Sequence, residues 1–196
     1  MICNPKIDPS KLSVDDKIKL VRESDGLLID LLDGLEVEGG LHLDGCTSLT
    51  HLPEGLKVGW HLYLEGCTSL THIPEGLNIG GGLCLEGCTS LTHLPEGLKV
   101  KGHLDLGGCT SLTHLPEGLN IGGGLDLEGC TSITHLPDEL EVKGNLYLEG
   151  CTSLTHIPEG LKIRRDLYLH GCTSLPYKGK KDLPKSIKVK GRIFWS

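Results

Sequence analysis

The stretch GCTSLTHLPEGL occupies residues 45–56 and recurs letter for letter at residues 87–98 and 108–119. Near-copies stand at residues 66–77, 129–140 and 150–161. The whole unit spans 21 residues and can be written L-x-L-x-G-C-T-S-L-T-H-L-P-E-G-L-x-V-x-G-x. A fixed period of this length is typical of a solenoid, in which each unit forms one turn and neighbouring turns stack. The 196-residue chain is therefore predicted to be a stack of coils.

Each unit contains two segments with strand-like patterning. Leu62 and Leu64 alternate with polar neighbours, as a half-buried strand requires. Gly66 permits the turn that follows, and Pro74 favours extended backbone on the far wall. Ile79 belongs to a second short extended segment, before glycines return the chain to the sheet. Stacking of these segments predicts a β-rich solenoid with a parallel sheet and little helix.

The L-x-L-x-x-C-x-x-L core of the unit resembles the leucine-rich-repeat signature, and the resemblance covers about residues 27–195. The LPEGL half is similar to the short LP-containing repeats of bacterial leucine-rich-repeat proteins, including host-directed effectors. The resemblance implies a right-handed solenoid with a concave parallel sheet and a convex side of extended segments or short strands. It also implies an interaction scaffold, in the cytoplasm or delivered to a host cytosol.

The chain divides into a cap, a repeat region and a second cap. These are residues 1–26, 27–175 and 176–196. The segment SVDDKIKLVRES at 13–24 is expected to form a short amphipathic helix with Ser13 as its N-cap. The repeats begin with a degenerate half-unit, LLIDLLDGLEV, at residues 27–37. In the basic last turn, Ile193 and Trp195 take the places of the strand leucines.

Charge is distributed unevenly along the chain, whose net charge is −7. Residues 1–39 hold 5 basic and 9 acidic residues, residues 40–170 hold 7 and 16, and residues 171–196 hold 7 and 1. An acidic body with a basic tail disfavours nucleic acid as the main partner and favours a basic protein or weak head-to-tail self-association. No apolar run approaches a signal-peptide core or a membrane span, so we expect a soluble chain without a membrane partner.

Nine cysteines are present, and seven of them follow the 21-residue period. The seven are Cys46, Cys67, Cys88, Cys109, Cys130, Cys151 and Cys172. An odd column without C-x-x-C spacing predicts reduced, buried thiols in a reducing compartment. Cys84 lies outside the column, at an outward strand position, and is expected to be exposed.

A histidine column and a threonine–serine column also follow the period. The histidines are His51, His72, His93, His114, His135 and His156. They are expected on the outer wall, as a solvated ladder with the Glu or Asp three residues later, and nothing in the unit builds a closed set of metal ligands. Hydrogen bonding to turn backbone is the simplest role for the hydroxyls. A metal-binding or water-ordering array remains an alternative function, as does a structural or self-assembling spacer.

The chemistry varies mainly at the outward strand positions, which are the residues before, between and after the two strand leucines. Over the seven turns within residues 40–170 they carry no Lys or Arg and eight carboxylates, at residues 44, 65, 86, 105, 126, 128, 149 and 166. Three of the four tyrosines project from the same positions. Two unit charges about 4.8 Å apart in water repel by roughly 0.9 kcal/mol, so such a face is mildly unfavourable unless a partner complements it.

Tyrosine among charges is a common composition for protein interfaces. Trp60 replaces a turn glycine and is expected to be an exposed anchor at the edge. We therefore expect non-catalytic binding of a protein or peptide, basic in character, on the concave face. No motif indicates an enzyme, a cofactor or a metal. The candidate partner-binding residues are His42, Asp44, Trp60, His61, Tyr63, Glu65, Glu86, His103, Asp105, Asp126, Glu128, Tyr147, Glu149, Asp166 and Tyr168.

Overall fold

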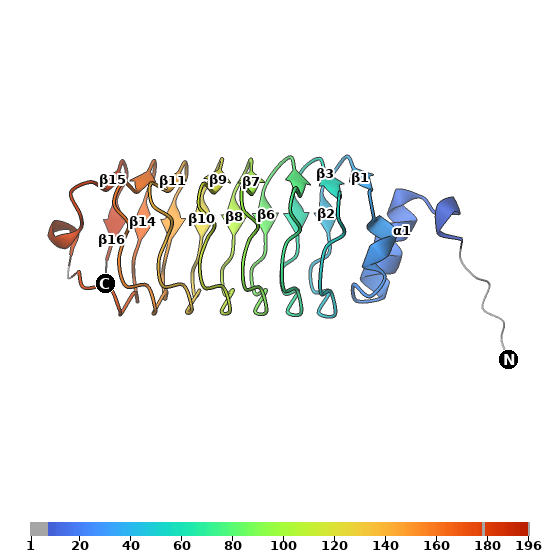
Figure 1. The fold of residues 1–196 in the computed structure, drawn as a ribbon, viewed down its shortest axis with the longest axis horizontal. Coiled ribbons are helices and arrows are strands. Elements are labelled where there is room, and N and C mark those ends of the chain that lie inside the picture. Colours follow the sequence, from blue (N-terminus) through green and yellow to red (C-terminus); the bar gives the residue numbers. More distant parts are fainter. Residues whose placement is uncertain (1–7, 178, 196) are drawn as a thin grey trace.

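The computed structural model describes residues 8–177 and 179–195, which form a rod with a helix at its N-terminal end (Figure 1). Two parallel eight-stranded sheets run along the rod. Sheet A contains β1 (Glu36–Val37), β3 (Lys57–Val58), β5 (Asn78–Ile79), β7 (Lys99–Val100), β9 (Asn120–Ile121), β11 (Glu141–Val142), β13 (Lys162–Ile163) and β15 (Lys188–Val189). Sheet B contains β2 (Leu41–His42), β4 (Leu62–Tyr63), β6 (Leu83–Cys84), β8 (Leu104–Asp105), β10 (Leu125–Asp126), β12 (Leu146–Tyr147), β14 (Leu167–Tyr168) and β16 (Ile193–Phe194). The predicted solenoid with turns of 21 residues is confirmed.

Successive turns stack in register in both sheets. Leu62 pairs with Leu83 in sheet B, and Val58 pairs with Ile79 in sheet A. The Leu62 N–H donates to the Gly82 carbonyl oxygen at 3.0 Å, so each turn is held to the next by backbone hydrogen bonds. Because the partners lie 21 residues apart, the sequence period becomes the register of both sheets. Assignment to the leucine-rich-repeat family and curvature of sheet B remain predictions.

Two glycines in most units adopt left-handed backbone conformations. Gly66 follows a sheet B strand with φ of 70°, and Gly76 precedes a sheet A strand with φ of 72°. A Cβ atom is disfavoured in this region, so glycine recurs at both places. Glu139 stands where the second glycine belongs and has φ of 55°. The backbone of this turn is therefore strained at Glu139.

The core is aliphatic, and the column cysteines belong to it. No polar or charged side chain is buried within residues 8–177 and 179–195. The Cys67 thiol donates to the Leu43 carbonyl oxygen at 3.2 Å, and the next five column cysteines make the same contact with the preceding turn. Burial raises the pKa of Cys67 and of Cys88 to about 12. The prediction that the thiols of this column are buried is therefore confirmed. Their lack of reactivity remains a prediction.

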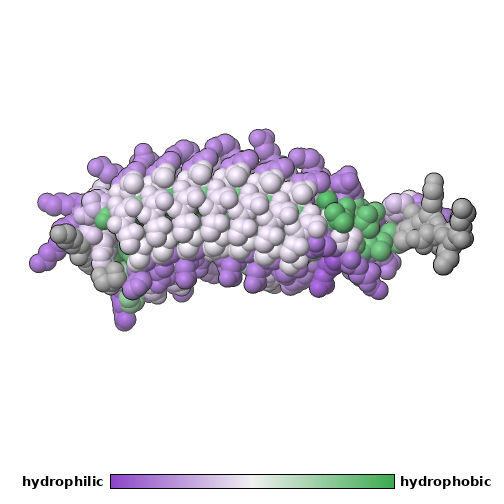
Figure 2. Space-filling view, turned by 90° about the horizontal axis from the view of Figure 1, so that it is seen from below, coloured by the Kyte–Doolittle hydropathy of each residue, from purple (hydrophilic) through white to green (hydrophobic). Residues whose placement is uncertain are grey.

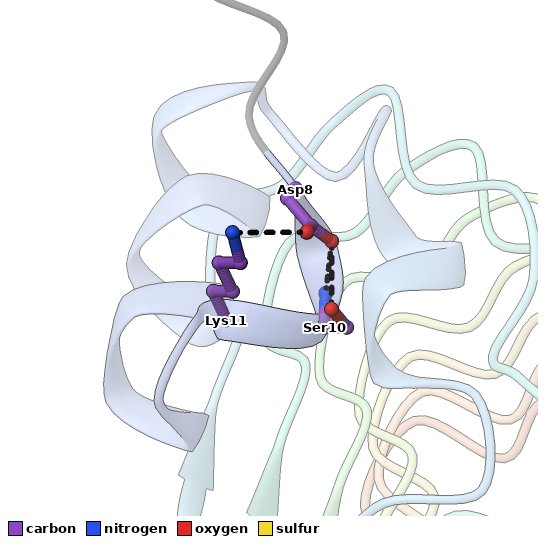
Figure 3. Close-up of polar contacts among 3 residues, drawn as sticks. All are labelled: Asp8, Ser10 and Lys11. Atoms are coloured by element: carbon purple, nitrogen blue, oxygen red, sulfur yellow. Dashed lines mark hydrogen bonds and ion pairs between the residues drawn. The ribbon is translucent and has the colours of Figure 1, made fainter.

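The expected N-terminal helix is α1 (Val14–Glu23). The Ser13 hydroxyl accepts a hydrogen bond from the Asp16 N–H at 3.1 Å, so Ser13 is the N-cap as predicted. A short 3₁₀ helix, Pro9–Lys11, precedes it. There the Asp8 carboxylate accepts from the Ser10 N–H at 3.1 Å and lies 3.7 Å from the Lys11 ammonium (Figure 3). No helix in the described part of the chain is long and apolar enough to cross a membrane.

The first half-unit contains a 3₁₀ helix, Ile29–Leu32, that the repeat pattern did not predict. Ile29 and Leu32 are both buried. A 3₁₀ turn has three residues, so side chains three positions apart lie on the same side, and here that side faces the core. At the other end, the 3₁₀ helix Lys180–Asp182 lies in an insertion before β15. Ile193 then pairs with Leu167, as the sequence predicts.

Candidate protein-binding face

The outward side of sheet B, here called the sheet-B face, presents eight middle positions in one line. They are His42, Tyr63, Cys84, Asp105, Asp126, Tyr147, Tyr168 and Phe194. Each follows a buried Leu or a half-buried Ile, because successive side chains of a strand point to opposite sides. Rings therefore stand at both ends of the line and carboxylates in its centre.

Three rings stack at the C-terminal end of the sheet-B face. The ring centroids of Tyr147 and Tyr168 are 4.6 Å apart, as are those of Tyr168 and Phe194. In-register parallel strands are about 4.8 Å apart, so stacking follows directly from the register. Phe194 was not among the predicted site residues. The sequence could have identified it, because aligning Ile193 with the strand leucines also places Phe194 in the outward column.

A second ring cluster lies at the N-terminal end of the face. The His42 and Tyr63 rings stack with centroids 4.2 Å apart. His61 lies beside Tyr63 at 5.8 Å, and its Nδ1 accepts a hydrogen bond from the Gly82 N–H at 2.7 Å. Trp60 is 65% exposed and meets His61 edge-on at 6.1 Å. Four predicted residues are thus brought together, with an exposed indole at the edge.

A column of carboxylates runs beside the middle line. Asp44, Glu65, Glu86 and Glu128 are exposed, and Glu149 is half-buried. In the described part of the chain, the one ion pair to these five is His42–Asp44, at 3.5 Å. Burial and the neighbouring charges of Asp105, Glu65 and Glu128 raise the pKa of Glu86. The column is therefore negative, and no Lys or Arg among the described residues forms an ion pair with it.

Two half-buried carboxylates occupy the centre of the middle line. Asp105 and Asp126 lie opposite each other on β8 and β10. Their Oδ1 atoms accept backbone N–H groups two residues on, from Gly107 at 3.0 Å and from Glu128 at 2.8 Å. Burial raises the pKa of Asp126 to about 6, and the charges of Asp105 and Glu128 add to the effect. A positive group placed here would offset this repulsion.

A cavity of about 370 Å³ opens beside these two carboxylates, over the glycines of residues 122–124. His103, Asn145 and Tyr147 line it. Lys143 and Arg165 line it as well, although neither belongs to the outward strand positions. The sequence pattern showed no cation on this face, because both residues stand in the turns that enter the strands. The tertiary structure makes them line the same cavity as the two carboxylates.

One predicted position differs from its expected exposure, and another also has a structural contact. Cys84 is half-buried and not exposed, which corrects the sequence prediction. Its short side chain pairs in register between Tyr63 and Asp105, and burial raises the pKa of its thiol. Asp166 accepts the Arg192 N–H at 2.7 Å and therefore helps to hold the last turn.

The histidine column lies on a different wall, where His72, His93 and His114 line one surface hollow together with Glu54, Glu75 and Glu96. No ion pair between this column and these Glu residues is formed among the described residues, while His51 lies 3.4 Å from the Asp30 carboxylate. Members of the column contact the hydroxyl of the preceding Thr, as in Thr92–His93 at 2.9 Å. His72 and His93 stack with centroids 6.4 Å apart. Among the residues that the structure describes, no group of three or more His, Cys, Asp or Glu could hold a metal ion.

The GCTSLT turns carry exposed Thr and mostly half-buried Ser side chains. Seen from below, the rod has a band of intermediate hydropathy with strongly hydrophilic residues along both margins (Figure 2). Several hydroxyls bond to turn backbone, as predicted. The Ser132 hydroxyl donates to the Thr110 carbonyl oxygen at 2.5 Å, and that of Thr155 donates to Thr134 at 3.2 Å.

The chain was compared with protein-family models, with curated proteins and with solved structures. None of them matches it.

Proposed function

We propose that this chain is a non-catalytic binding module of the leucine-rich-repeat type, whose concave sheet-B face binds a basic protein or peptide. The observation that carries the proposal is the stack of Tyr147, Tyr168 and Phe194 beside the carboxylates of Asp126 and Glu149, which form no ion pair with the described residues. Phe194 is 38% exposed, so its ring is available to a partner.

The aromatic residues favour an interface. Four of the chain's seven aromatic residues, Tyr63, Tyr147, Tyr168 and Phe194, lie in the middle line of one face. Tyr and Trp bring large contact area at low entropic cost and are enriched where binding energy concentrates. Trp60 adds a fifth ring at the edge. A fold that needed these rings for its core would have buried them, and the core here is aliphatic.

The carboxylates favour a basic partner. Lys or Arg groups brought between them would replace repulsion by attraction and would also speed encounter. The eight strands of sheet B span roughly 34 Å at about 4.8 Å per interval. That length accommodates about ten residues of extended peptide. The face is therefore large enough for a peptide segment and need not engage a whole folded domain.

The test uses two variants with equal changes of charge on different walls. In the face variant, Glu65, Glu86, Glu128 and Glu149 become Gln. In the control variant, Glu54, Glu75, Glu96 and Glu117 of the LPEGL segments become Gln. Binding to an immobilised peptide library of graded charge is measured at low and at high salt.

We expect positively charged peptides to bind the unchanged protein, more weakly as salt rises. The face variant should lose about tenfold or more in affinity, and the control should stay within about twofold. Equal losses in the two variants would show that net charge, and not this face, governs binding. Binding that ignores peptide charge would also contradict the proposal.

Self-association is a second candidate, and a specific observation favours it. Leu27 and Leu28, near the acidic N-terminal end, are 72% and 45% exposed. The C-terminal end is rich in Lys, so opposite ends of two copies are complementary in charge. Light scattering at low and high salt tests this candidate. Replacement of both leucines by Ser should abolish any assembly, and a strict monomer at millimolar concentration would remove the idea.

A further inference from the structure

The cavity beside Asp105 and Asp126 is lined by three successive glycines, Gly122, Gly123 and Gly124. In the turn before, the third position is His103, and in the turn after it is Asn145. A Cβ atom on Gly124 would meet His103 Nδ1 and the Asn145 carbonyl oxygen at 3.0 Å. Close packing by neighbouring turns therefore requires glycine at this position, and His103 and Asn145 line the cavity beside it.

Several polar atoms at the cavity retain capacity for a ligand. Each Asp uses Oδ1 for a backbone N–H, which leaves Oδ2 of Asp126 without a hydrogen bond from the described residues. The Tyr147 hydroxyl accepts from Asn145 Nδ2 at 2.7 Å, so its own proton can be donated. His103 Nδ1 accepts the Gly124 N–H at 2.9 Å, so Nε2 carries the proton of the neutral ring.

The cavity is lined by negative residues from the strands and by positive residues from the turns before the strands. Asp105 and Asp126 stand on the strands of sheet B, while Lys143 and Arg165 stand in the turns that lead into β12 and β14. Lys143 and Arg165 are exposed, and neither forms an ion pair with the described residues. Two negative and two positive groups therefore face one space. A ligand that carries both signs complements it better than a simple cation does.

The volume of the cavity limits the size of the ligand that it can hold. A volume of about 370 Å³ is near the lower end of the range for small-ligand sites, roughly 300–1,000 Å³, and accommodates one large residue. The Tyr147 ring supplies a wall on which the stem or charge of a Lys or Arg side chain can rest. An internal Lys of a peptide would leave the two cations of the lining unmatched. A C-terminal Lys carries the missing carboxylate.

We propose that this cavity is the subsite for the C-terminal lysine or arginine residue of a peptide. The side-chain cation lies between the carboxylates of Asp105 and Asp126, against Tyr147. The α-carboxylate lies toward Arg165 and Lys143. This inference rests on the proposed function, because it assigns the end of a basic peptide to one place on the sheet-B face.

Three acetylated pentapeptides, Gly-Ser-Gly-Ser-X, test the subsite by calorimetry. In the first, X is Lys with a free carboxylate. In the second, X is Lys with a C-terminal amide, and in the third it is norleucine with a free carboxylate. We expect the first to bind and the other two to bind about tenfold more weakly or worse, as loss of one charge-assisted contact implies. Free lysine should also bind more weakly than the first peptide.

Paired variants separate the two halves of the subsite. Asp105→Asn with Asp126→Asn should abolish the preference for Lys over norleucine and keep the preference for carboxylate over amide. Lys143→Gln with Arg165→Gln should do the reverse. General damage to the fold would lower both preferences together. Controls are Asp44→Asn, on the same face, and Lys101→Gln, two turns before Lys143 at the same unit position, since neither residue lines the cavity.

Several outcomes would overturn the inference. They are equal binding of the three peptides, no binding at millimolar peptide, free lysine binding as tightly as the first peptide, or preferences unchanged in both paired variants. The proposed function is judged separately by the Glu→Gln face variant, none of whose residues lines the cavity. If that variant loses basic peptides while the three pentapeptides bind alike, the binding face stands and the subsite falls.

Discussion

The buried thiol of Cys109 donates a hydrogen bond to the carbonyl oxygen of Leu85, 24 residues earlier, at 3.2 Å. The same carbonyl accepts the Cys88 N–H at 3.0 Å, so one oxygen joins two successive turns. Cysteine serves here as a small apolar residue with one weak donor. This contact explains why the column is cysteine: it fits the core and bonds to the turn below.

Replacement of Cys109 by Ala should lower the free energy of unfolding by about 1–2 kcal/mol, because a buried contact and a hydrogen bond are both lost. Urea unfolding followed by circular dichroism measures the effect. Cys84→Ala is the control, since Cys84 is half-buried and outside the column, and it should change stability by less than about 0.5 kcal/mol. Equal effects at the two positions would contradict the role assigned to the column.

Thiol reactivity should distinguish Cys84 from the column. In a Cys3→Ser variant, we expect Ellman's reagent to modify one thiol of the folded protein slowly and the remaining seven after unfolding. The slow rate follows from burial, which raises the Cys84 pKa, and the rate should increase as pH rises. Mass spectrometry of the labelled peptide identifies the site. Rapid modification of any column cysteine in the folded state would show that the column is accessible.

The stability of the protein should depend on the ionisation of Asp126. Its folded pKa, about 6, lies above the value near 3.9 of an unfolded chain. Between these values the folded state binds more protons, so the free energy of unfolding falls as pH rises from about 4 to about 6 and is level above that. Asp126→Asn should therefore stabilise at pH 7.5 by roughly 1 kcal/mol, after allowance for solvent screening, and should have little effect at pH 4.

At Asp25, ionisation is expected to change the free energy of unfolding in the direction opposite to that at Asp126. Hydrogen bonds from Ser48 and Thr47 lower its pKa in the folded state. Its contribution to stability is therefore present above the unfolded pKa and lost as pH falls through the folded one. Asp25→Asn should destabilise at pH 7.5, where Asp126→Asn stabilises. Urea titrations of both variants at four pH values measure these signs, and a shared sign at pH 7.5 would refute the assignment.

Glu139→Gly should stabilise the protein. Glu139 has φ of 55° at a turn where other units carry glycine, and a left-handed non-glycine residue costs about 1–2 kcal/mol. Part of that gain is offset, because glycine is freer in the unfolded chain and the exposed Glu139–Lys162 ion pair is lost. We expect a net gain of about 0.5–1 kcal/mol by thermal or urea unfolding. The matched control, Asp138→Gly at the preceding residue, should destabilise.

Contacts that follow from the period were predictable, and contacts between non-equivalent positions were not. The pairing of Leu62 with Leu83 follows from spacing alone. Cys84 was predicted exposed, because its column pointed outward. Its actual burial depends on the lengths of the Tyr63 and Asp105 side chains beside it. Phe194 lies beyond an insertion, and its place in the outward line follows once Ile193 is aligned with the strand leucines.

By itself, the sequence determined the solenoid, the register of both sheets, the N-terminal helix with its Ser13 cap, and the burial of the cysteine column. These follow from a period of 21, because identical units solve the same local problem of turns and core. Only the tertiary structure decided that Lys143 and Arg165 line one cavity with Asp105 and Asp126, and that Cys84 is half-buried. The physical reason is that the period places each residue at a known position of its turn. A cavity, in contrast, depends on how side chains from different positions of neighbouring turns fill the space between them.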